Sequence, residues 1–315
     1  MFDGKTVLVI GGSGSLGHCL TDSFLKTDVK EVRIFSRGED LQHKMRIEFP
    51  DERVNFIIGD IRDYDRLRES TRKVDTIINA AALKQVADCE RHPFEAVKTN
   101  ILGAYNVKQV AIANEVENVV SISTDKAAKP VSAYGMTKGL QEKIMITGEV
   151  RSKTKFTVAR FGNFINSRGS VIPFFRNCVA NNQPLYVTDF RMTRFIIPLS
   201  DAVGIIFRIL QEAKGNETFV LKRPVCLIKD LAEVIADGKV AVLEGKIRAG
   251  EKLHEILVQE DEMRRAVEDE DHYTIYPSGT EDVPRLQRPL VEYTSENENR
   301  LSKQELHNLL ADVIK

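Results

Sequence analysis

Five side chains that can move protons stand close together in the sequence: Thr124, Asp125, Lys126, Tyr134 and Lys138. Tyr134 and Lys138 are four residues apart, so a helix would put them on one face. The charge of Lys138 would lower the pKa of the Tyr134 phenol and make a phenolate available near neutral pH. Such a pair suffices for hydride transfer. Asp125 and Lys126 add an acid and a base, the groups needed to remove water from an oxidised intermediate.

A glycine-rich turn near the start of the chain has the form of a nucleotide-binding loop. Gly11, Gly14 and Gly17 follow a β-branched run and open a helical stretch, with Ser15 and Leu16 between the last two glycines. Glycine lets the backbone turn tightly and approach a pyrophosphate, and a helix N-terminus offers free N–H groups to an anion. Because the turn lies between a strand pattern and a helix pattern, it predicts a dinucleotide site and not a plain tight turn.

The residues at the end of the second predicted strand favour NADP over NAD. An NAD site usually has Asp or Glu there, which binds the ribose hydroxyls, whereas this chain has Ser36 and Arg37. Arg37 could hold a 2′-phosphate through charge-assisted hydrogen bonds; the alternative is an ordinary surface arginine. Further cofactor contacts are expected from Asp60 and Ile61 after the third strand, from Ala80, Ala81 and Ala82 after the fourth, and from Tyr134 and Lys138.

These segments need a scaffold, and the first half of the chain has an alternating pattern that supplies one. Apolar, strand-like runs are separated by helical stretches such as 16–26 and 93–114. Apolar strands with helical crossovers give a parallel sheet that is covered on both faces. The predicted strands are 5–10, 31–35, 54–58, 75–79, 119–123, 156–160 and 218–221.

The second half of the chain is less regular. We expect residues 168–189 to be rich in loops, because they include Pro173 and Pro184. Residues 279–299 are polar and predict an extended segment, while helices are expected at 229–235 and 303–314.

Composition excludes several classes of protein. A net charge of −1 argues against bulk electrostatic binding of nucleic acid. The four cysteines are scattered without a Cys-x-x-Cys pair, which indicates reduced thiols and no zinc site. His254 has no second His or Cys nearby, so we expect no metal. No apolar run approaches the roughly 20 residues that span a bilayer, and the chain enters a strand almost at once; we expect a cytoplasmic protein without a membrane partner.

Several motifs resemble those of the extended short-chain dehydrogenase/reductases. Within that superfamily the chain looks like the inverting UDP-N-acetylglucosamine 4,6-dehydratases of flagellin-sugar and capsule biosynthesis. The run STDKAA at 123–128 is specific for this branch, whereas the Tyr-x-x-x-Lys pair marks only the superfamily. The other matching motifs are AALKQV at 81–86, YGMTK at 134–138, RFGN at 160–163, SRGSVIP at 167–173, MTRF at 192–195 and GEKLHE at 250–255.

The resemblance covers most of the chain and implies an α/β fold. We expect a Rossmann-type doubly wound parallel sheet with a smaller C-terminal α/β substrate-binding domain. Residues 1–165 would form the NADP-binding domain, to which 195–222 return. Residues 223–315 would form the substrate-binding domain, with a contribution from 166–194. A homo-oligomer is implied as well, often a hexamer in this branch.

The implied reaction assigns a role to each of the five proton-moving residues. Tyr134 takes the proton of the sugar 4-hydroxyl, to which Thr124 is hydrogen-bonded, while NADP accepts the hydride from C4. Neutral Lys126 removes the C5 proton, and protonated Asp125 protonates the departing C6 hydroxyl. Both roles need shifted pKa values, which a closed site can supply. Return of the hydride to C6 and protonation of C5 from the opposite face, with Lys126 as donor, give an L-sugar.

The implied substrate is a UDP-sugar, held by residues around and after the sixth strand. Arg194 and Arg248 would clamp the diphosphate, because guanidinium groups match phosphate oxygens, and Glu251 would bind the uridine ribose. Asn163 would contact the diphosphate or the sugar. The remaining candidates are Arg168, the uracil-flanking residues Val171 and Phe174, and Lys84, for which substrate binding and simple ion pairing are equal alternatives.

Three rival functions stay open. Two are enzymes, a retaining dehydratase and a nucleotide-sugar 4-epimerase, and the third is a non-catalytic NADP-binding regulator. Thr124 and Tyr134 are ten residues apart, a gap shorter than in the sugar 4-epimerases, and retaining relatives carry Met in place of Tyr134. The chain departs from the family pattern at Ile10, where Thr is usual, and in the short, polar segment 237–246, which makes the sugar specificity less certain.

Overall fold

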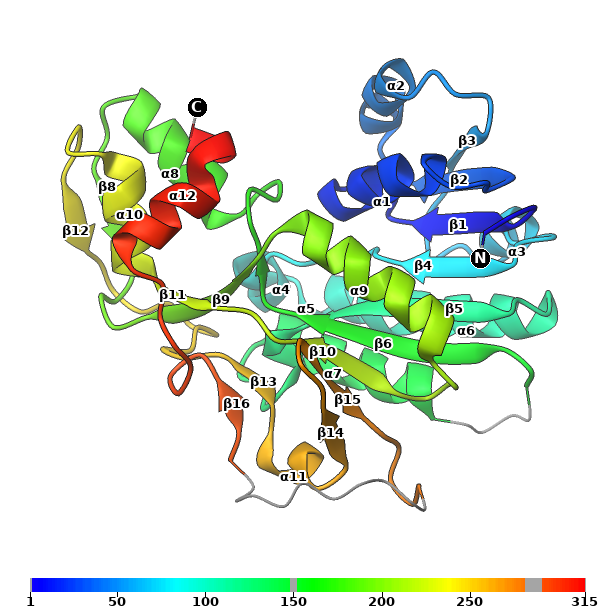
Figure 1. Ribbon diagram of the computed structural model, residues 1–315. Coiled ribbons are helices and arrows are strands. Elements are labelled where there is room, and N and C mark those ends of the chain that lie inside the picture. The colour runs from blue at the N-terminus through cyan, green and yellow to red at the C-terminus, as the bar shows by residue number, and fades with distance from the viewer. Residues whose placement is uncertain (1, 148–151, 281–290, 315) are drawn as a thin grey trace.

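A nine-stranded sheet forms the centre of the molecule (Figure 1). The computed structural model describes residues 2–147, 152–280 and 291–314. The strand order is β14-β15-β10-β6-β5-β4-β1-β2-β3. The seven strands from β10 to β3 are parallel, β15 pairs antiparallel with β10, and β14 pairs antiparallel with β15. The strands are β1 (Thr6–Ile10), β2 (Glu31–Ser36), β3 (Val54–Ile58), β4 (Thr76–Asn79), β5 (Asn118–Thr124), β6 (Lys155–Phe161), β10 (Thr218–Leu221), β14 (Ala266–Glu268) and β15 (His272–Ile275).

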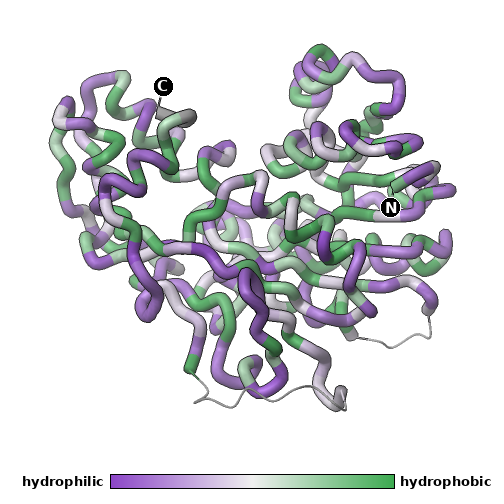
Figure 2. The backbone as a smooth tube through the Cα atoms, in the orientation of Figure 1, coloured by the Kyte–Doolittle hydropathy of each residue, from purple (hydrophilic) through white to green (hydrophobic). Residues whose placement is uncertain are grey.

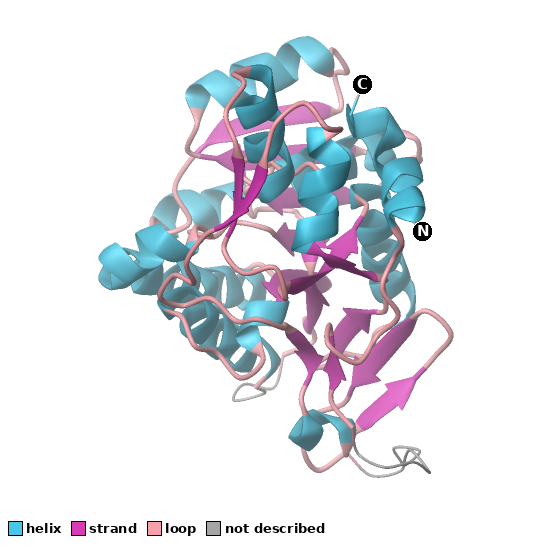
Figure 3. Ribbon diagram, turned by 90° about the vertical axis from the view of Figure 1, so that its left-hand side faces the viewer, coloured by secondary structure: helices cyan, strands magenta, loops and turns pink. Residues whose placement is uncertain are grey.

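Helices cover both faces of this sheet, as Figure 3 shows from the side. One apolar cluster joins the sheet to α1 (Ser15–Leu25), α2 (Glu39–Glu48) and α9 (Leu199–Glu212). A second cluster joins the opposite face to α3 (Tyr64–Ser70), α6 (Gly103–Ala113) and α7 (Ala133–Ile146). In Figure 2 hydrophobic residues follow the central strands, while the outer loops are largely hydrophilic. The predicted fold class, an α/β protein with a doubly wound parallel sheet, is confirmed.

A smaller body of helices and short strands packs around its own apolar cluster, which includes Ile172, Leu185, Leu231 and Leu306. It contains α8 (Val171–Ala180), α10 (Ile228–Ala236) and α12 (Lys303–Ile314), together with the parallel pair β8 (Leu185–Val187) and β12 (Val242–Glu244). Two further sheets are present. One holds β7 (Asn163–Phe164), β9 (Thr193–Ile197) and β11 (Val225–Leu227); the other holds β13 (Ile256–Val258) and β16 (Tyr293–Thr294), is followed after β13 by α11 (Glu260–Met263), and packs against the β10–β15 end of the central sheet. The division into two domains at the predicted boundaries stays a prediction.

All seven predicted strands are present, but the expectation of a loop-rich 168–189 is wrong. This stretch holds α8 and β8. Pro173 lies in the first turn of α8, where its missing N–H has no intrahelical partner to lose, and Pro184 comes directly before β8. The apolar residues Ile172, Phe175 and Cys178 supply the buried helix face.

The predicted helix at 93–114 is interrupted by a π-helical turn. It runs as α5 (Pro93–Ala96), a π-helical turn (Val97–Leu102) and α6, preceded by a short α4 (Val86–Arg91). π-Helical turns inside α-helices often occur at functional sites. Of the polar segment predicted at 279–299, residues 281–290 lie outside the described residues, and β16 forms in the remainder. Within the described ranges, no helix is both long and apolar enough to cross a bilayer.

Candidate active site

A cavity of about 980 Å³ opens where the C-terminal ends of the central strands meet. Ile10, Ala80, Thr124 and Gly162, which end or follow β1, β4, β5 and β6, all line it. The strand order reverses between β1 and β4, and ligands of doubly wound sheets bind at such a switch point. Among the predicted site residues, those on the wall are Gly11, Gly14, Ser15, Leu16, Gly17, Ser36, Arg37, Ile61, Ala80, Ala81, Ala82, Lys84, Thr124, Asp125, Lys126, Tyr134, Lys138, Asn163, Arg168, Val171, Arg248 and Glu251.

The glycine-rich turn fits a dinucleotide. Gly11 has a φ of +78°, and a Cβ there would lie 2.8 Å from the backbone nitrogen of Ala81, so only glycine lets β1 and β4 approach this closely. Gly14 is the N-cap of α1 and has no side-chain cap, and the first turn of α1 holds no acidic residue. The free N–H groups of α1 can therefore bind a pyrophosphate.

Ser36 and Arg37, predicted for a 2′-phosphate, stand at the far end of this cavity. The Ser36 hydroxyl is buried and is hydrogen-bonded to the Ser13 hydroxyl at 2.9 Å and to the Gln42 amide at 2.9 Å. The Arg37 guanidinium is largely exposed and lies 3.8 Å from the carboxylate of Asp60.

A tight packing of two segments sets the position of the catalytic candidates. Thr124 ends β5, and Asp125–Ala127 form a 3₁₀ turn. Helix α7 begins after Ser132, whose hydroxyl accepts a hydrogen bond from the Gly135 N–H. A Cβ at Gly135 would lie 2.2 Å from the Lys126 carbonyl oxygen. Because glycine at 135 allows this contact, Tyr134 on α7 is brought beside the 3₁₀ turn.

Lys126 forms an ion pair on each side. Its Nζ is 2.9 Å from Asp125 Oδ1 and 3.1 Å from Glu255 Oε1, and the Asp125 carboxylate also accepts a hydrogen bond from the Thr124 hydroxyl at 2.9 Å. Burial by itself would lower the pKa of Lys126, but the charges of Asp125 and Glu255 outweigh it and raise the pKa above the ordinary value. The two carboxylates therefore favour the charged form of Lys126, whereas its predicted role as the base at C5 needs the neutral amine.

The pKa values of Tyr134 and Lys138 differ from those expected for a phenolate next to a charged lysine. Burial raises the pKa of the Tyr134 phenol to about 12, and the charge that opposes this rise is that of Lys126. Lys138 is itself buried, which lowers its pKa to about 7. Its Nζ donates hydrogen bonds to the Ile122 carbonyl and to the Gln141 side chain, each at 2.6 Å. The cation that favours a phenolate at Tyr134 is thus Lys126 and not Lys138.

A loop from the substrate side reaches across to the glycine-rich turn. The Arg168 backbone N–H donates to the Ser15 hydroxyl at 3.0 Å, and its guanidinium donates to the Ser13 carbonyl at 2.7 Å. On the other side, Lys84 Nζ donates to the Arg168 carbonyl at 2.8 Å. Arg248 and Glu251, both predicted for the substrate, are paired with each other, with an Nη2–Oε1 distance of 2.5 Å.

Three predicted site residues lie outside the wall of the cavity that the described residues form. Asp60 is held by Arg62 through an ion pair of 2.6 Å. Phe174 is exposed on α8, with 59% of its surface accessible. Arg194 is buried and donates to the carbonyls of Thr193, Lys252 and Leu253. Because these carbonyls occupy its donors, Arg194 fixes the loop before β13 in this structure and does not face the cavity.

Two further polar residues support the site although neither is among the predicted site residues. Asn100, in the π-helical turn, binds the backbone N–H and carbonyl of Leu83 and donates to the Thr137 hydroxyl on α7 at 3.0 Å. Glu255 reaches Lys126 from the segment before β13. An Asn in a largely apolar helix is the signal for the first. The second belongs to the matching motif at 250–255, but its contact with Lys126 leaves no local signal, because Lys126 lies in a distant part of the chain.

Comparison with known proteins adds the following. The family described as "Polysaccharide biosynthesis protein" matches residues 7–277. A UDP-glucose 4-epimerase of Rickettsia bellii is 40% identical over an alignment of 331 positions, which covers 99% of this chain and 97% of that protein. The X-ray structure of Pen from Bacillus thuringiensis is 38% identical, covers 99% of this chain and 98% of its own, and superposes with a TM-score of 0.93. DesIV, a dTDP-glucose 4,6-dehydratase from Streptomyces venezuelae solved with NAD, is 22% identical with a TM-score of 0.72 and coverages of 79% and 86%, a likeness of fold alone.

Proposed function

The chain belongs to the polysaccharide biosynthesis protein family, and from this premise we propose that it is an NADP-dependent enzyme that dehydrates UDP-N-acetylglucosamine across C5 and C6 and inverts C5. The relatives' names support the broader class, an enzyme of the nucleotide-sugar dehydratase and epimerase type. One observation carries the finer proposal: the Asp125–Lys126 ion pair lies on the wall of the same cavity as Tyr134.

A nicotinamide dinucleotide, when bound, supplies reversible hydride transfer at carbon. It would be held by the glycine-rich turn and α1, with Ser36 and Arg37 at the 2′-phosphate. Tyr134 would take the proton of the 4-hydroxyl while the C4 hydride is transferred to the cofactor; together these losses leave a ketone at C4 and make the neighbouring C5–H acidic. The nearby charge of Lys126 stabilises the phenolate that this step needs.

The charged state of Lys126 is compatible with its proposed part in the elimination. Transfer of one proton along the 2.9 Å contact from Lys126 to Asp125 turns the ion pair into a neutral amine and a carboxylic acid. The amine then takes the C5 proton, and the acid protonates the departing C6 hydroxyl, which leaves as water. Afterwards Lys126 is again an ammonium and Asp125 a carboxylate, so the pair gives up and receives one proton each in the elimination. As a hydride is added at C6, the ammonium can protonate C5. This leaves a neutral amine at Lys126, and the proton that Tyr134 took from the 4-hydroxyl restores the starting charges.

The second candidate is a nucleotide-sugar 4-epimerase. The specific observation in its favour is that relatives named UDP-glucose 4-epimerase are 40% identical to this chain over almost its whole length. An epimerase needs Tyr134 but has no use for an acid and a base at C5 and C6. The Asp125–Lys126 pair in the cavity therefore favours the dehydratase.

The deciding experiment is an incubation of the enzyme with NADP and UDP-N-acetylglucosamine in deuterated water, followed by NMR of the product. The proposal requires loss of water, deuterium at C5 and an L-arabino ring. A C4 epimer without deuterium at C5, from this substrate or from UDP-glucose, would establish the epimerase. Deuterium at C5 of a D-configured 4-keto sugar would indicate the retaining dehydratase, and binding of NADP without turnover of either sugar would indicate the regulator.

A further inference from the structure

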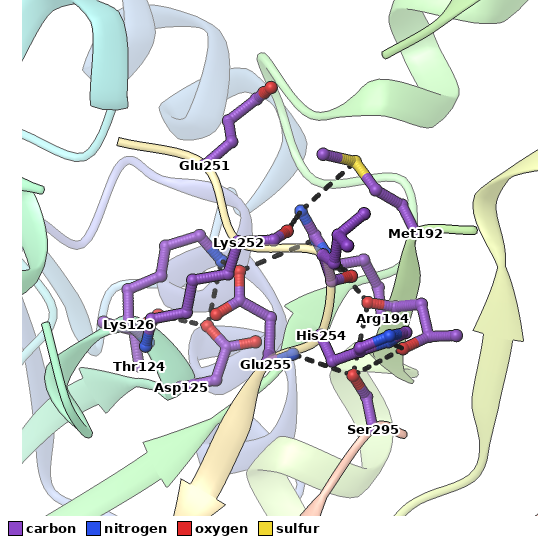
Figure 4. Close-up of polar contacts among 12 residues, drawn as sticks. Thr124, Asp125, Lys126, Met192, Arg194, Glu251, Lys252, His254, Glu255 and Ser295 are labelled. Atoms are coloured by element: carbon purple, nitrogen blue, oxygen red, sulfur yellow. Dashed lines mark hydrogen bonds and ion pairs between the residues drawn. The ribbon is translucent and has the colours of Figure 1, made fainter. Parts of the chain in front are cut away.

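The carboxylate of Glu255 is enclosed in protein and surrounded by charges. The residue is 1% exposed, and its Oε1 lies 3.1 Å from Lys126 Nζ and 3.6 Å from Arg194 Nε. Figure 4 shows it between these two cations, with the carboxylate of Asp125 also at Lys126. Its second oxygen, Oε2, has no hydrogen-bond partner among the described residues. Burying a carboxylate costs several kcal/mol unless opposite charges compensate it, so the fold retains this group at the catalytic lysine at a cost.

The backbone around Glu255 holds it rigidly. The Glu255 N–H donates to the Ser295 hydroxyl at 2.8 Å, and the Ser295 N–H donates to the Glu255 carbonyl at 2.8 Å. The Ser295 hydroxyl is also 2.7 Å from the Thr193 hydroxyl, which in turn contacts His254 Nδ1 at 2.7 Å. Thr193 and Ser295 are fully buried. Three segments, those of β9, β13 and β16, are thus joined at the residue whose side chain points to Lys126.

The charge balance at Lys126 depends on this residue. The titratable or charged groups that face Lys126 are Asp125, Glu255, Arg194, Tyr134 and Lys252. Of these only Asp125 and Glu255 are carboxylates, and the cations Arg194 and Lys252 oppose them. With Asp125 alone, two positive neighbours would face one negative neighbour, and a free amine would form more easily.

We propose that Glu255 is the positioning residue for proton transfer at C5: its carboxylate fixes the Lys126 amine and keeps it protonated, so that Lys126 carries the proton that C5 receives. The inference rests on the proposed function for its chemical meaning. The contact itself is independent of that function, since Glu255 and Lys126 meet without any substrate.

The test compares Glu255→Gln, Glu255→Asp and the wild type. Competitive acetylation at about pH 9, read at Lys126 by mass spectrometry, reports the fraction of free amine. Loss of an adjacent charge shifts a pKa by roughly 1–3, so labelling of Lys126 should rise about tenfold or more in Glu255→Gln. Glu255→Asp keeps the charge and should restore most of the protection. Glu217→Gln, which removes a buried carboxylate that binds only backbone N–H groups, should leave the labelling of Lys126 unchanged.

Activity provides the second readout. In Glu255→Gln the pH profile of deuterium exchange at C5 should move to lower pH, because the free amine of Lys126 forms at lower pH. Equal labelling of Lys126 in Glu255→Gln and the wild type overturns the proposal. If the wild type fails to dehydrate the sugar, the proposed function falls, but the labelling still decides the role of Glu255.

The role of Glu255 can also be tested if Glu255→Gln fails to fold. If Glu255→Gln does not fold, the cause in this proposal is a buried Lys126 ammonium that keeps one carboxylate, Asp125, in place of two. Removing both charges in Lys126→Met/Glu255→Gln should then recover folding, because a buried pair can be replaced by uncharged groups at little cost. A double variant that stays unfolded contradicts the proposal.

Discussion

Arg160 and Glu262 form a fully enclosed ion pair that ties the central sheet to the C-terminal part of the chain. Two parallel contacts join them, Nη1 to Oε2 at 2.7 Å and Nη2 to Oε1 at 2.8 Å, and Arg160 is 2% exposed. The same guanidinium binds Glu142 on α7 at 2.6 Å. Arg160 therefore connects the helix that carries Tyr134 and Lys138 with α11, behind the catalytic cavity.

The first prediction concerns this pair. Glu262→Gln leaves the Arg160 charge with one buried partner in place of two, and breaking a buried pair typically costs about 3–5 kcal/mol. We expect a loss of that order in the free energy of unfolding, measured by urea denaturation. Asp22→Asn, which removes the exposed pair of Asp22 and Lys26, should cost less than about 1 kcal/mol. Equal losses in the two variants would contradict the structural role assigned to Arg160.

The second prediction concerns Lys126. Lys126→Met should lower dehydration about a hundredfold to ten-thousandfold, the usual contribution of a positioned acid or base, with NADP binding retained. Lys129→Met is the matched control, since Lys129 is a neighbouring lysine that is exposed and paired with Glu292. Steady-state assays of product formation and a binding titration measure both effects. Unchanged turnover in Lys126→Met would exclude Lys126 from the reaction.

The third prediction concerns Tyr134 and pH. Burial raises its pKa to about 12, so in the range from about pH 7 to 10 the phenolate is scarce and increases with pH. The rate of cofactor reduction in a single turnover, before any loss of water, should increase with pH over this range in the wild type. Tyr134→Phe should abolish it. A rate that is independent of pH, or retained in Tyr134→Phe, would require another base.

The fourth prediction follows from the buried Lys138. Its pKa in the folded protein is about 7, whereas the unfolded chain keeps this lysine protonated up to about pH 10.4. Between these values the unfolded state binds more protons, so the Lys138 contribution to stability increases with pH. The free energy of unfolding of the wild type should therefore rise relative to that of Lys138→Met from about pH 7 to 9. A difference that does not change with pH would show that Lys138 keeps its charge in the folded protein.

The fifth prediction concerns the choice of cofactor. Hydrogen bonds to charged groups contribute roughly 1.5–3 kcal/mol, so Arg37→Ala should weaken NADP binding about tenfold or more and leave NAD binding almost unchanged. Ser36→Asp should reverse the preference, because a carboxylate accepts from the ribose hydroxyls and repels a 2′-phosphate. Isothermal titration with both cofactors measures the ratio. An equal effect of Arg37→Ala on both would mean that Arg37 is only a surface arginine.

The sequence alone determined those features that depend on near neighbours in the chain. A β-branched run before Gly11 and a helical pattern after Gly17 specify the nucleotide turn, and the spacing of Tyr134 and Lys138 places them on one helix face. The strand positions could be predicted for the same reason. A strand buried on both faces is a continuous apolar run, and such a run can be recognised without knowing which distant segments contact it.

Only the tertiary structure decided the charge states and the supporting contacts. Lys126 is charged because Glu255 meets it from the segment before β13, and Arg194 turns from the cavity because it binds the carbonyls of Lys252 and Leu253. The α8 helix forms because its apolar face is covered by α10. In each case the outcome depends on a contact between segments that are far apart in the sequence. Which distant segments meet cannot be predicted from the pattern of residues within one segment.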